Sequence, residues 1–266
     1  MKRTSQQFSI LLFISLMACN SSISTITDET PIIEGSGNVI TEIYNATEEF
    51  NKLTVQGNLT VYLKKGDFQN IEIDAEDNIM QLVKVEVKDG ELIAKTESSI
   101  STNKEVNVYI LYKDLNSISS IGNARIKVLS ELSGETVSLD CSDSSYLIID
   151  SIEAENLEVN SKGSSNIILK RVLTENISAN LQGGSNLKIA GETKTIEALT
   201  SGRSDLYAKN LFAYSANISS IGSSTSRVHV KKELCAQAFG AADIDYYGNP
   251  ITIVENKSGS ATVKKR

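Results

Sequence analysis

Two carboxylates, Asp205 and Asp243, come closest in type and spacing to a catalytic pair. Glycoside hydrolases place two carboxyl groups about 5 to 10 Å apart on one surface. Both residues occupy the same position of a repeat described below, two units apart, so such a separation is feasible. Other repeats carry Arg, Tyr, Asn or Thr there, which is typical of a polar ladder beside a turn. We therefore predict that the protein is not an enzyme, with a divergent polysaccharide lyase or hydrolase as an alternative.

Other nucleophiles and metal ligands are sparse. His229 is the only histidine, and it lies in an Arg-Val-His-Val-Lys stretch that is typical of a surface strand. A structural zinc site needs four ligands, usually Cys or His, which one histidine and separated thiols do not supply. We predict no metal site and no cofactor.

A tyrosine with charged neighbours could instead bind a ligand. A tyrosine ring offers a large apolar surface that ends in a polar hydroxyl, and it can pack against a sugar ring or another protein. The possible binding surface consists of Tyr207, Arg203, Arg227, Asp205 and Asp243. Tyr246 lies in a column that points inward, where it would fill the core.

These residues belong to a repeat of about twenty residues that begins near residue 116. Its anchor position is almost always glycine, with spacings of 18 to 21 residues: Gly122, Asp143, Gly163, Gly183, Gly202, Gly222, Gly240 and Gly259. Glycine adopts positive φ without a steric penalty, so each anchor predicts a sharp corner.

Columns at fixed offsets from the anchor describe the strands. Two residues after it stand small residues: Ala124, Ser145, Ser165, Ser185, Ser204, Ser224, Ala242 and Ala261. Four residues after it stand mostly aliphatic residues: Ile126, Leu147, Ile167, Leu187, Leu206, Ser226, Ile244 and Val263. Apolar residues also recur four and six positions before the anchor. This period of two predicts one strand on each side of every corner, each with one buried face.

Such units bury their apolar faces only by stacking. We therefore predict an all-β protein, a parallel β-helix whose regular rungs span residues 116–266, and take the right hand as the usual one for parallel crossovers. The register is too constant for a β-sandwich, and the Leu-Asn signature of leucine-rich repeats is missing from the sequence. Residues 35–115 are less regular; we expect wider β coils that cap the stack, with a separate small β domain as the alternative.

The N-terminus predicts export. Residues 1–18 combine Lys2 and Arg3 with a short hydrophobic run, as in a secretory signal peptide. The residues that end in Cys19 resemble the bacterial lipobox, in which the cysteine is acylated and becomes the new N-terminus. Residues 19–34 would form a flexible tether, and the lipid would be the membrane attachment. We expect an outer membrane lipoprotein, on the periplasmic face rather than the cell surface, because no acidic run follows the cysteine.

The net charge of the chain argues against one class of binding partner. The formal charge is −7, and loss of Lys2 and Arg3 with the signal peptide would make it about −9, so nucleic acid is not an expected partner.

Cys141 and Cys235 lie about five rungs apart, roughly 24 Å at the strand spacing of a sheet. A disulfide requires Cα atoms within about 7 Å. We predict two free thiols, with Cys141 pointing into the core.

An ordered set of motifs resembles the GIN-domain family. The motifs are Gly35-Ser36-Gly37-Asn38-Val39, the strand from Phe50 to Val55, the strand from Val61 to Gly66, Val87-Lys88-Asp89-Gly90-Glu91-Leu92, and Leu115 before Gly122. The resemblance covers about residues 35–266. It implies a β-helix-like fold, a place in the cell envelope and a proposed role as an adhesin head domain, and it supplies no catalytic residues.

The sequence thus favours a non-catalytic, adhesin-like binding module that presents one face of a β-helix to a glycan or protein. A periplasmic structural or assembly module, which could be a homo-oligomer, is the alternative.

Overall fold

The computed structural model describes residues 32–44, 46, 48–96 and 100–266. The predicted signal peptide, the predicted lipidation site Cys19 and most of the predicted tether lie outside these residues. The described part folds almost entirely into β-strands, with one short helix, α1 (Asp77–Met80). No helix within the described ranges has the length and hydrophobicity needed to span a membrane.

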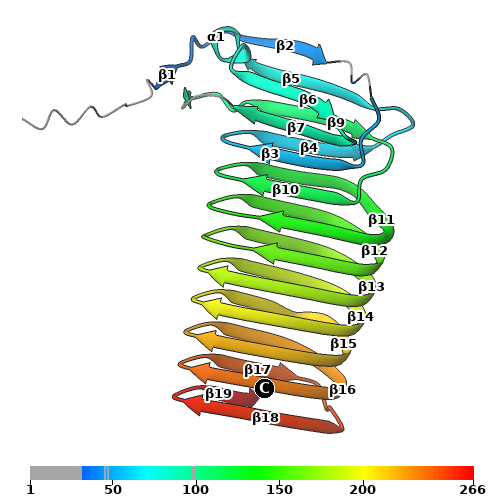
Figure 1. Ribbon diagram of the computed structural model, residues 1–266, viewed down its shortest axis with the longest axis vertical. Helices are drawn as coiled ribbons and strands as arrows, with labels where there is room; N and C mark the ends of the chain where they lie inside the picture. The colour runs from blue at the N-terminus through cyan, green and yellow to red at the C-terminus, as the bar shows by residue number, and fades with distance from the viewer. Residues whose placement is uncertain (1–31, 45, 47, 97–99) are drawn as a thin grey trace, which may run out of the picture. The chain divides into compact units, whose positions relative to one another are not determined.

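Long strands wind into a parallel stack (Figure 1). The regular rungs are formed by β10 (Ser117–Ile121), β11 (Arg125–Cys141), β12 (Tyr146–Ser161), β13 (Asn166–Gly183), β14 (Asn186–Gly202), β15 (Asp205–Gly222), β16 (Thr225–Gly240), β17 (Asp243–Tyr247), β18 (Thr252–Gly259) and β19 (Thr262–Lys265). The first residues of each long strand lie in one sheet, the strand turns through a wide bend, and its last residues lie in a second sheet that ends at the next anchor. We call the sheet after each anchor the back sheet, and the sheet before it, which faces the viewer in Figure 1, the front sheet.

The pairing register reproduces the columns read from the sequence. Every neighbouring pair in the column four residues after the anchor is aligned, from Ile126 opposite Leu147 to Ile244 opposite Val263. All of these pairings are parallel. The predicted parallel β-helix with rungs of about twenty residues is therefore confirmed.

The corners have the predicted geometry. All eight anchors have positive φ, including Asp143 at 62°. The small residue two positions later is buried wherever it is serine. In three of these corners its hydroxyl closes the turn: Ser165 Oγ donates to the carbonyl of Lys162 at 2.8 Å, Ser204 Oγ to that of Ser201 at 2.9 Å, and Ser224 Oγ to that of Ile221 at 3.2 Å. The hydroxyl thus pairs with a partly buried carbonyl of the turn.

Side chains between the sheets form the core, with polar interruptions. Ser226, the exception in its aliphatic column, is fully buried and bonds to Ser220 at 2.9 Å and Thr200 at 3.2 Å. Cys141 is buried and Cys235 half-buried, and both are free thiols, as predicted. Tyr246 is buried, in agreement with its inward column.

The N-terminal half joins the same stack. β3 (Lys52–Gln56) and β4 (Thr60–Lys65) pair in parallel with β10 and β11, and on their other side with β7 (Glu91–Thr96) and β9 (Asn107–Tyr112). Antiparallel pairing then takes over with β2 (Val39–Tyr44), β5 (Asn70–Glu76) and β6 (Val83–Lys88), while β1 (Ile33–Glu34) pairs with β8 (Ile100–Ser101). The described residues form one compact unit.

Candidate binding site

Four of the five predicted site residues lie on the outer face of the back sheet, within three consecutive strands. Asp205 and Tyr207 come from β15, Arg227 from β16 and Asp243 from β17. The register places Tyr207 beside Arg227, while Thr225 stands between Asp205 and Asp243. Their side chains point outward because they alternate with buried positions along each strand.

The Tyr207 ring is held by groups on two strands. Its hydroxyl donates to Asp205 Oδ2 at 3.1 Å, and the Arg227 guanidinium lies 5.1 Å from the ring centroid. Arg227 Nε is 3.8 Å from Asp245 Oδ2, and Arg266 Nε donates to Asp245 Oδ1 at 2.9 Å. A nearly buried carboxylate thus fixes the guanidinium that covers the ring. The hydrogen bond to Asp245, followed by its charge, raises the pKa of Arg266.

Arg203 does not join this group. It lies in the corner after Gly202, exposed, and its backbone N–H donates to the carbonyl of Gly183 at 2.6 Å. Within the described part of the chain its side chain has no hydrogen-bond or ion-pair partner. Four predicted residues are thus organised by neighbours, whereas Arg203 is fixed only through its backbone.

The polar column that contains Asp205 and Asp243 behaves as a ladder. Asn186 Nδ2 donates to Asn166 Oδ1 one rung away at 3.1 Å, and Thr262 Oγ1 donates to Asp243. Thr225 thus separates the two carboxylates, and Asp243 accepts a hydrogen bond from Thr262 on the next rung.

The adjacent outward column continues along the back sheet. In register it reads Tyr109, Tyr62, Lys127, Ile148, Ile168, Lys188, Tyr207 and Arg227. The rings of Tyr62 and Tyr109 stack at 5.2 Å with 14° between their planes, and Lys127 Nζ lies 5.0 Å from the Tyr62 centroid. We call this the aromatic–cation column. Tyr207 and Arg227 are its last two members, and the register continues beyond them with Asp245 and Lys264.

A groove follows the wide bends, and the sequence analysis missed it. One wall is an outward column of Ser133, Glu153, Leu173, Glu192 and Phe212. The other consists of Glu155, Glu175, Lys194 and Tyr214, and the floor of Gly134, Ala154, Thr174 and Thr193. Its volume is about 570 Å³. We call it the bend groove.

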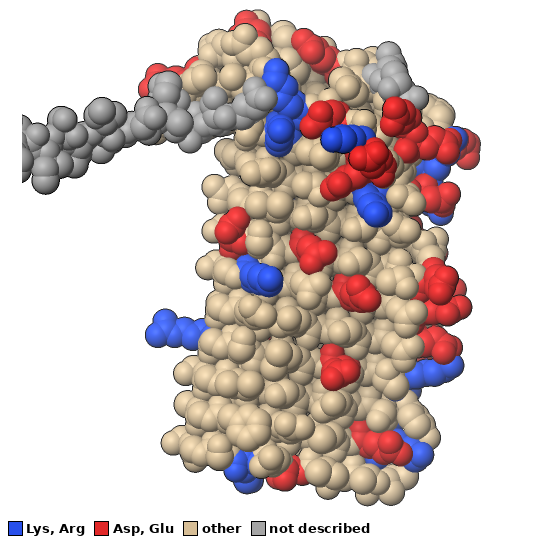
Figure 2. Space-filling model, in the orientation of Figure 1, with Lys and Arg blue, Asp and Glu red and all other residues tan. Residues whose placement is uncertain are grey.

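The bend groove is lined by charged side chains and by aromatic rings that contact lysines. Acidic side chains gather along the right edge of the stack, over the bends (Figure 2). Glu175 pairs with Lys194. Lys231 lies 5.7 Å from the Phe212 centroid and Lys232 lies 5.2 Å from that of Tyr214. The phenyl ring of Phe212 also meets the His229 imidazole edge-on at 4.7 Å.

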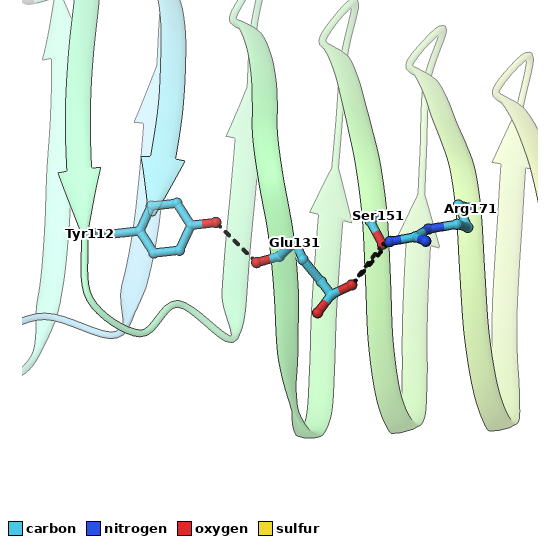
Figure 3. Close-up of polar contacts among 4 residues, drawn as sticks. All are labelled: Tyr112, Glu131, Ser151 and Arg171. Atoms are coloured by element: carbon cyan, nitrogen blue, oxygen red, sulfur yellow. Dashed lines mark hydrogen bonds and ion pairs between the residues drawn. The ribbon is translucent and has the colours of Figure 1, made fainter. Parts of the chain in front are cut away.

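A ladder of polar contacts fixes the start of three bends (Figure 3). The Tyr112 hydroxyl donates to the backbone carbonyl of Glu131 at 3.3 Å, and burial raises the Tyr112 pKa to about 12. Ser151 Oγ donates to Glu131 Oε2 at 3.0 Å, and Arg171 Nη2 reaches the same carboxylate at 3.2 Å. These contacts join β11, β12 and β13 beside the bend groove.

Within the described ranges, no group of three His, Cys, Asp or Glu side chains is arranged so that it could hold a metal ion.

Comparison with known families settles the kinship of the chain. Residues 49–250, well over half of the sequence, match the family described as "Putative auto-transporter adhesin, head GIN domain". The chain belongs to the GIN-domain family. The description of this family indicates a cell-envelope or surface protein. No curated protein matches the sequence.

Solved structures share the fold of this GIN-domain protein. A "putative lipid binding protein" from Parabacteroides distasonis has a TM-score of 0.83 at 19% identity, with 89% of this chain and 100% of that chain covered. A "putative adhesin" from Parabacteroides merdae has a TM-score of 0.77 at 18% identity, with 88% and 98% covered. One from Bacteroides fragilis has a TM-score of 0.67 at 22% identity, with 88% and 100% covered.

Proposed function

We propose that this GIN-domain protein is a non-catalytic, lipid-anchored envelope protein that binds a glycan on its back sheet. The observation that carries the proposal is the aromatic–cation column, in which tyrosine rings and cations, interrupted by Ile148 and Ile168, lie in one line along eight paired strands. Adhesin names in the family and among the similar structures agree with a binding role.

The chemistry of the column suits a long sugar chain. Tyr109 and Tyr207 are each more than one-third exposed, so the parts of the rings that Tyr62 and Arg227 leave uncovered offer apolar surface to a sugar. Lys127, Lys188 and Arg227 add charged donors along the same line. Because Tyr62 and Tyr207 are held by stacking, cation contacts or hydrogen bonds, binding would cost little side-chain entropy.

Glycan binding is tested on a glycan array followed by titration of the best ligand. Tyr207→Ala and Tyr109→Ala should each weaken binding about tenfold, which corresponds to about 1.4 kcal/mol. Tyr44→Ala is the matched control, because Tyr44 is similarly exposed but lies on β2. Equal affinity in all three variants, or no glycan bound by the wild type, would refute the proposal and favour a structural or assembly module of the periplasm.

The lipid anchor and the location require tests in cells. Palmitate should label the wild type and not the Cys19→Ser variant. We expect protease added to intact cells to leave an epitope-tagged copy uncut until the outer membrane is broken. Digestion on intact cells would instead place the protein on the surface, where the glycan would belong to another cell or a host.

The enzyme alternative has its own discriminating experiment. If the purified protein cleaves an acidic polysaccharide, and the Asp205→Ala/Asp243→Ala variant does not, the non-catalytic proposal is wrong. We expect no product release from either protein.

A further inference from the structure

The bend groove has the shape of a site for an extended chain. Its walls are columns of outward residues from successive rungs, so the groove follows the stacking direction, at about 4.8 Å per rung. The floor residues are small, which leaves room for a backbone: Gly134, Ala154, Thr174 and Thr193. The hydroxyls of the floor are already used, since Thr174 Oγ1 donates to Thr193 Oγ1 at 3.2 Å and Thr193 Oγ1 donates to the carbonyl of Thr195 at 3.0 Å.

The walls leave large apolar side chains in solvent. Leu173, Phe212 and Tyr214 are 54%, 40% and 49% exposed. Exposed apolar groups gathered in one concave surface are typical of an interaction site.

The charges of the groove select the occupant. Glu175 is neutralised by Lys194, but Glu153, Glu155 and Glu192 have no ion-pair or hydrogen-bond partner for their side chains among the described residues. All three are exposed and line the same cavity, the first two from β12 and the third from β14. Lys231 lies over Phe212 at one end of the groove, and carboxylates still outnumber cations in the lining. This arrangement repels phosphates and acidic glycans and attracts cations, which charge complementarity would direct to the groove.

We propose that the bend groove binds an extended, positively charged segment of a partner protein. Lysine or arginine side chains of that segment would reach Glu153, Glu155 and Glu192, and apolar side chains between them would cover Leu173 and Phe212. This site is separate from the aromatic–cation column of the back sheet, so it stands independently of glycan binding.

Fluorescence polarisation tests the proposal with a labelled peptide of about ten residues in which Lys and Leu alternate. The Glu153→Gln/Glu155→Gln/Glu192→Gln variant should bind the peptide at least tenfold more weakly than the wild type at low salt. The matched control, Glu42→Gln/Glu48→Gln/Glu86→Gln, removes the same charge from exposed positions of the N-terminal half and should change affinity less than twofold. A peptide with Glu in place of Lys should not bind.

A fluorescent reporter tests where the peptide lies. Because the chain has no tryptophan, Phe212→Trp introduces a single reporter in the groove, and Phe68→Trp introduces one at a distant exposed site. The Lys–Leu peptide should shift the emission of Trp only in the Phe212→Trp protein. Equal weakening in both glutamine variants, a shift at both reporters or at neither, or no binding to the wild type would overturn the proposal. Tyr207→Ala should leave peptide affinity unchanged.

Discussion

At the scale of single residues, two separate constraints favour glycine at the corners of the stack. Gly183 has a φ of +84°, and a Cβ there would come within 2.9 Å of the Gly163 carbonyl oxygen on the neighbouring rung. The first constraint comes from the local turn and the second from stacking. Asp143 shows that a residue other than glycine can adopt the turn, since its φ is 62°.

The two constraints can be separated by substitution. Gly37 has a φ of +85°, and nothing lies within 4 Å of the position that a Cβ would occupy, so Gly37→Ala should cost only the left-handed penalty of about 1 to 2 kcal/mol. Gly183→Ala should cost about 2 to 4 kcal/mol, because overpacking adds to that penalty. Urea denaturation measures both. Equal losses would show that the stacking contact is relieved by a small backbone shift.

Burial makes the two thiols chemically different. Burial raises the pKa of the Cys141 thiol to about 12, whereas Cys235 lies half-buried on the outer face of the front sheet. Disulfide reagents react with the thiolate. In a Cys19→Ser chain at pH 8, we expect one reactive thiol when folded and two after denaturation, measured with Ellman's reagent. Two thiols reacting at the same rate in the folded chain would contradict the inward orientation of Cys141.

The same shift links stability to pH. Because the folded-state pKa of Cys141 lies above its ordinary value of 9.0, the protonated thiol favours the folded state below pH 9. This contribution declines as the pH rises from about 9 toward about 12. Cys141→Ala should therefore reduce the alkaline loss of stability over that range in thermal unfolding curves. An unchanged alkaline loss would assign it to other groups.

At the scale of elements, the wide bends depend on side-chain contacts that the strands do not provide. Backbone pairing shifts register between Val128 and Glu131, where β11 leaves the back sheet. Ser151 is 8% exposed and contacts both the Glu131 carboxylate and the Arg171 guanidinium. The serine thus links three rungs where their ladder is irregular (Figure 3).

Removing that hydroxyl should loosen the bends. Ser151→Ala should cost about 1 to 2 kcal/mol, because the Glu131 carboxylate and the Arg171 guanidinium both lose a nearly buried partner. Ser178→Ala on the exposed face of the front sheet should change stability by less than about 0.5 kcal/mol. Chemical denaturation compares the two. A neutral Ser151→Ala would mean that Arg171 alone holds Glu131.

At the scale of the described stack, the C-terminal rung is the least protected. β18 is exposed along its whole length, and its Glu255 and Lys257 stand opposite Ala236 and Ala238 of the preceding rung. The charged side chains of β18 pair at 3.7 Å. Charged residues on an edge strand discourage pairing with another chain.

Two isoleucines of the same column test whether the last rung is less protected than an inner rung. Ile196 and Ile253 both stand six residues before their anchors, but they are 2% and 41% exposed. Ile196→Ala should cost about 2 to 5 kcal/mol, as for other buried aliphatic truncations, and Ile253→Ala less than about 1 kcal/mol. Hydrogen exchange should likewise be faster in β18 than in β14. Similar losses would indicate that the last rung is covered in solution.

The sequence by itself determined the length of each rung, its corners and which residues face the core. Glycine anchors, small corner residues and aliphatic columns each report a local constraint, and stacking repeats that constraint once per turn, so Ile126 and Val263 could be aligned without coordinates. The inward thiol of Cys141 and the meeting of Tyr207 with Arg227 follow from the same register.

Only the tertiary structure decided the bend groove, the antiparallel strands around β5 and the role of Asp245. Leu173, Glu192 and Phe212 share a column, but their distances from the preceding anchors vary because each bend absorbs the differences in repeat length. Strand alternation in the sequence predicts that Asp245 points outward, but in the structure Arg227 and Arg266 cover its carboxylate. Strand alternation is local and can be read along the chain, whereas a groove depends on how far apart two columns are held across a bend.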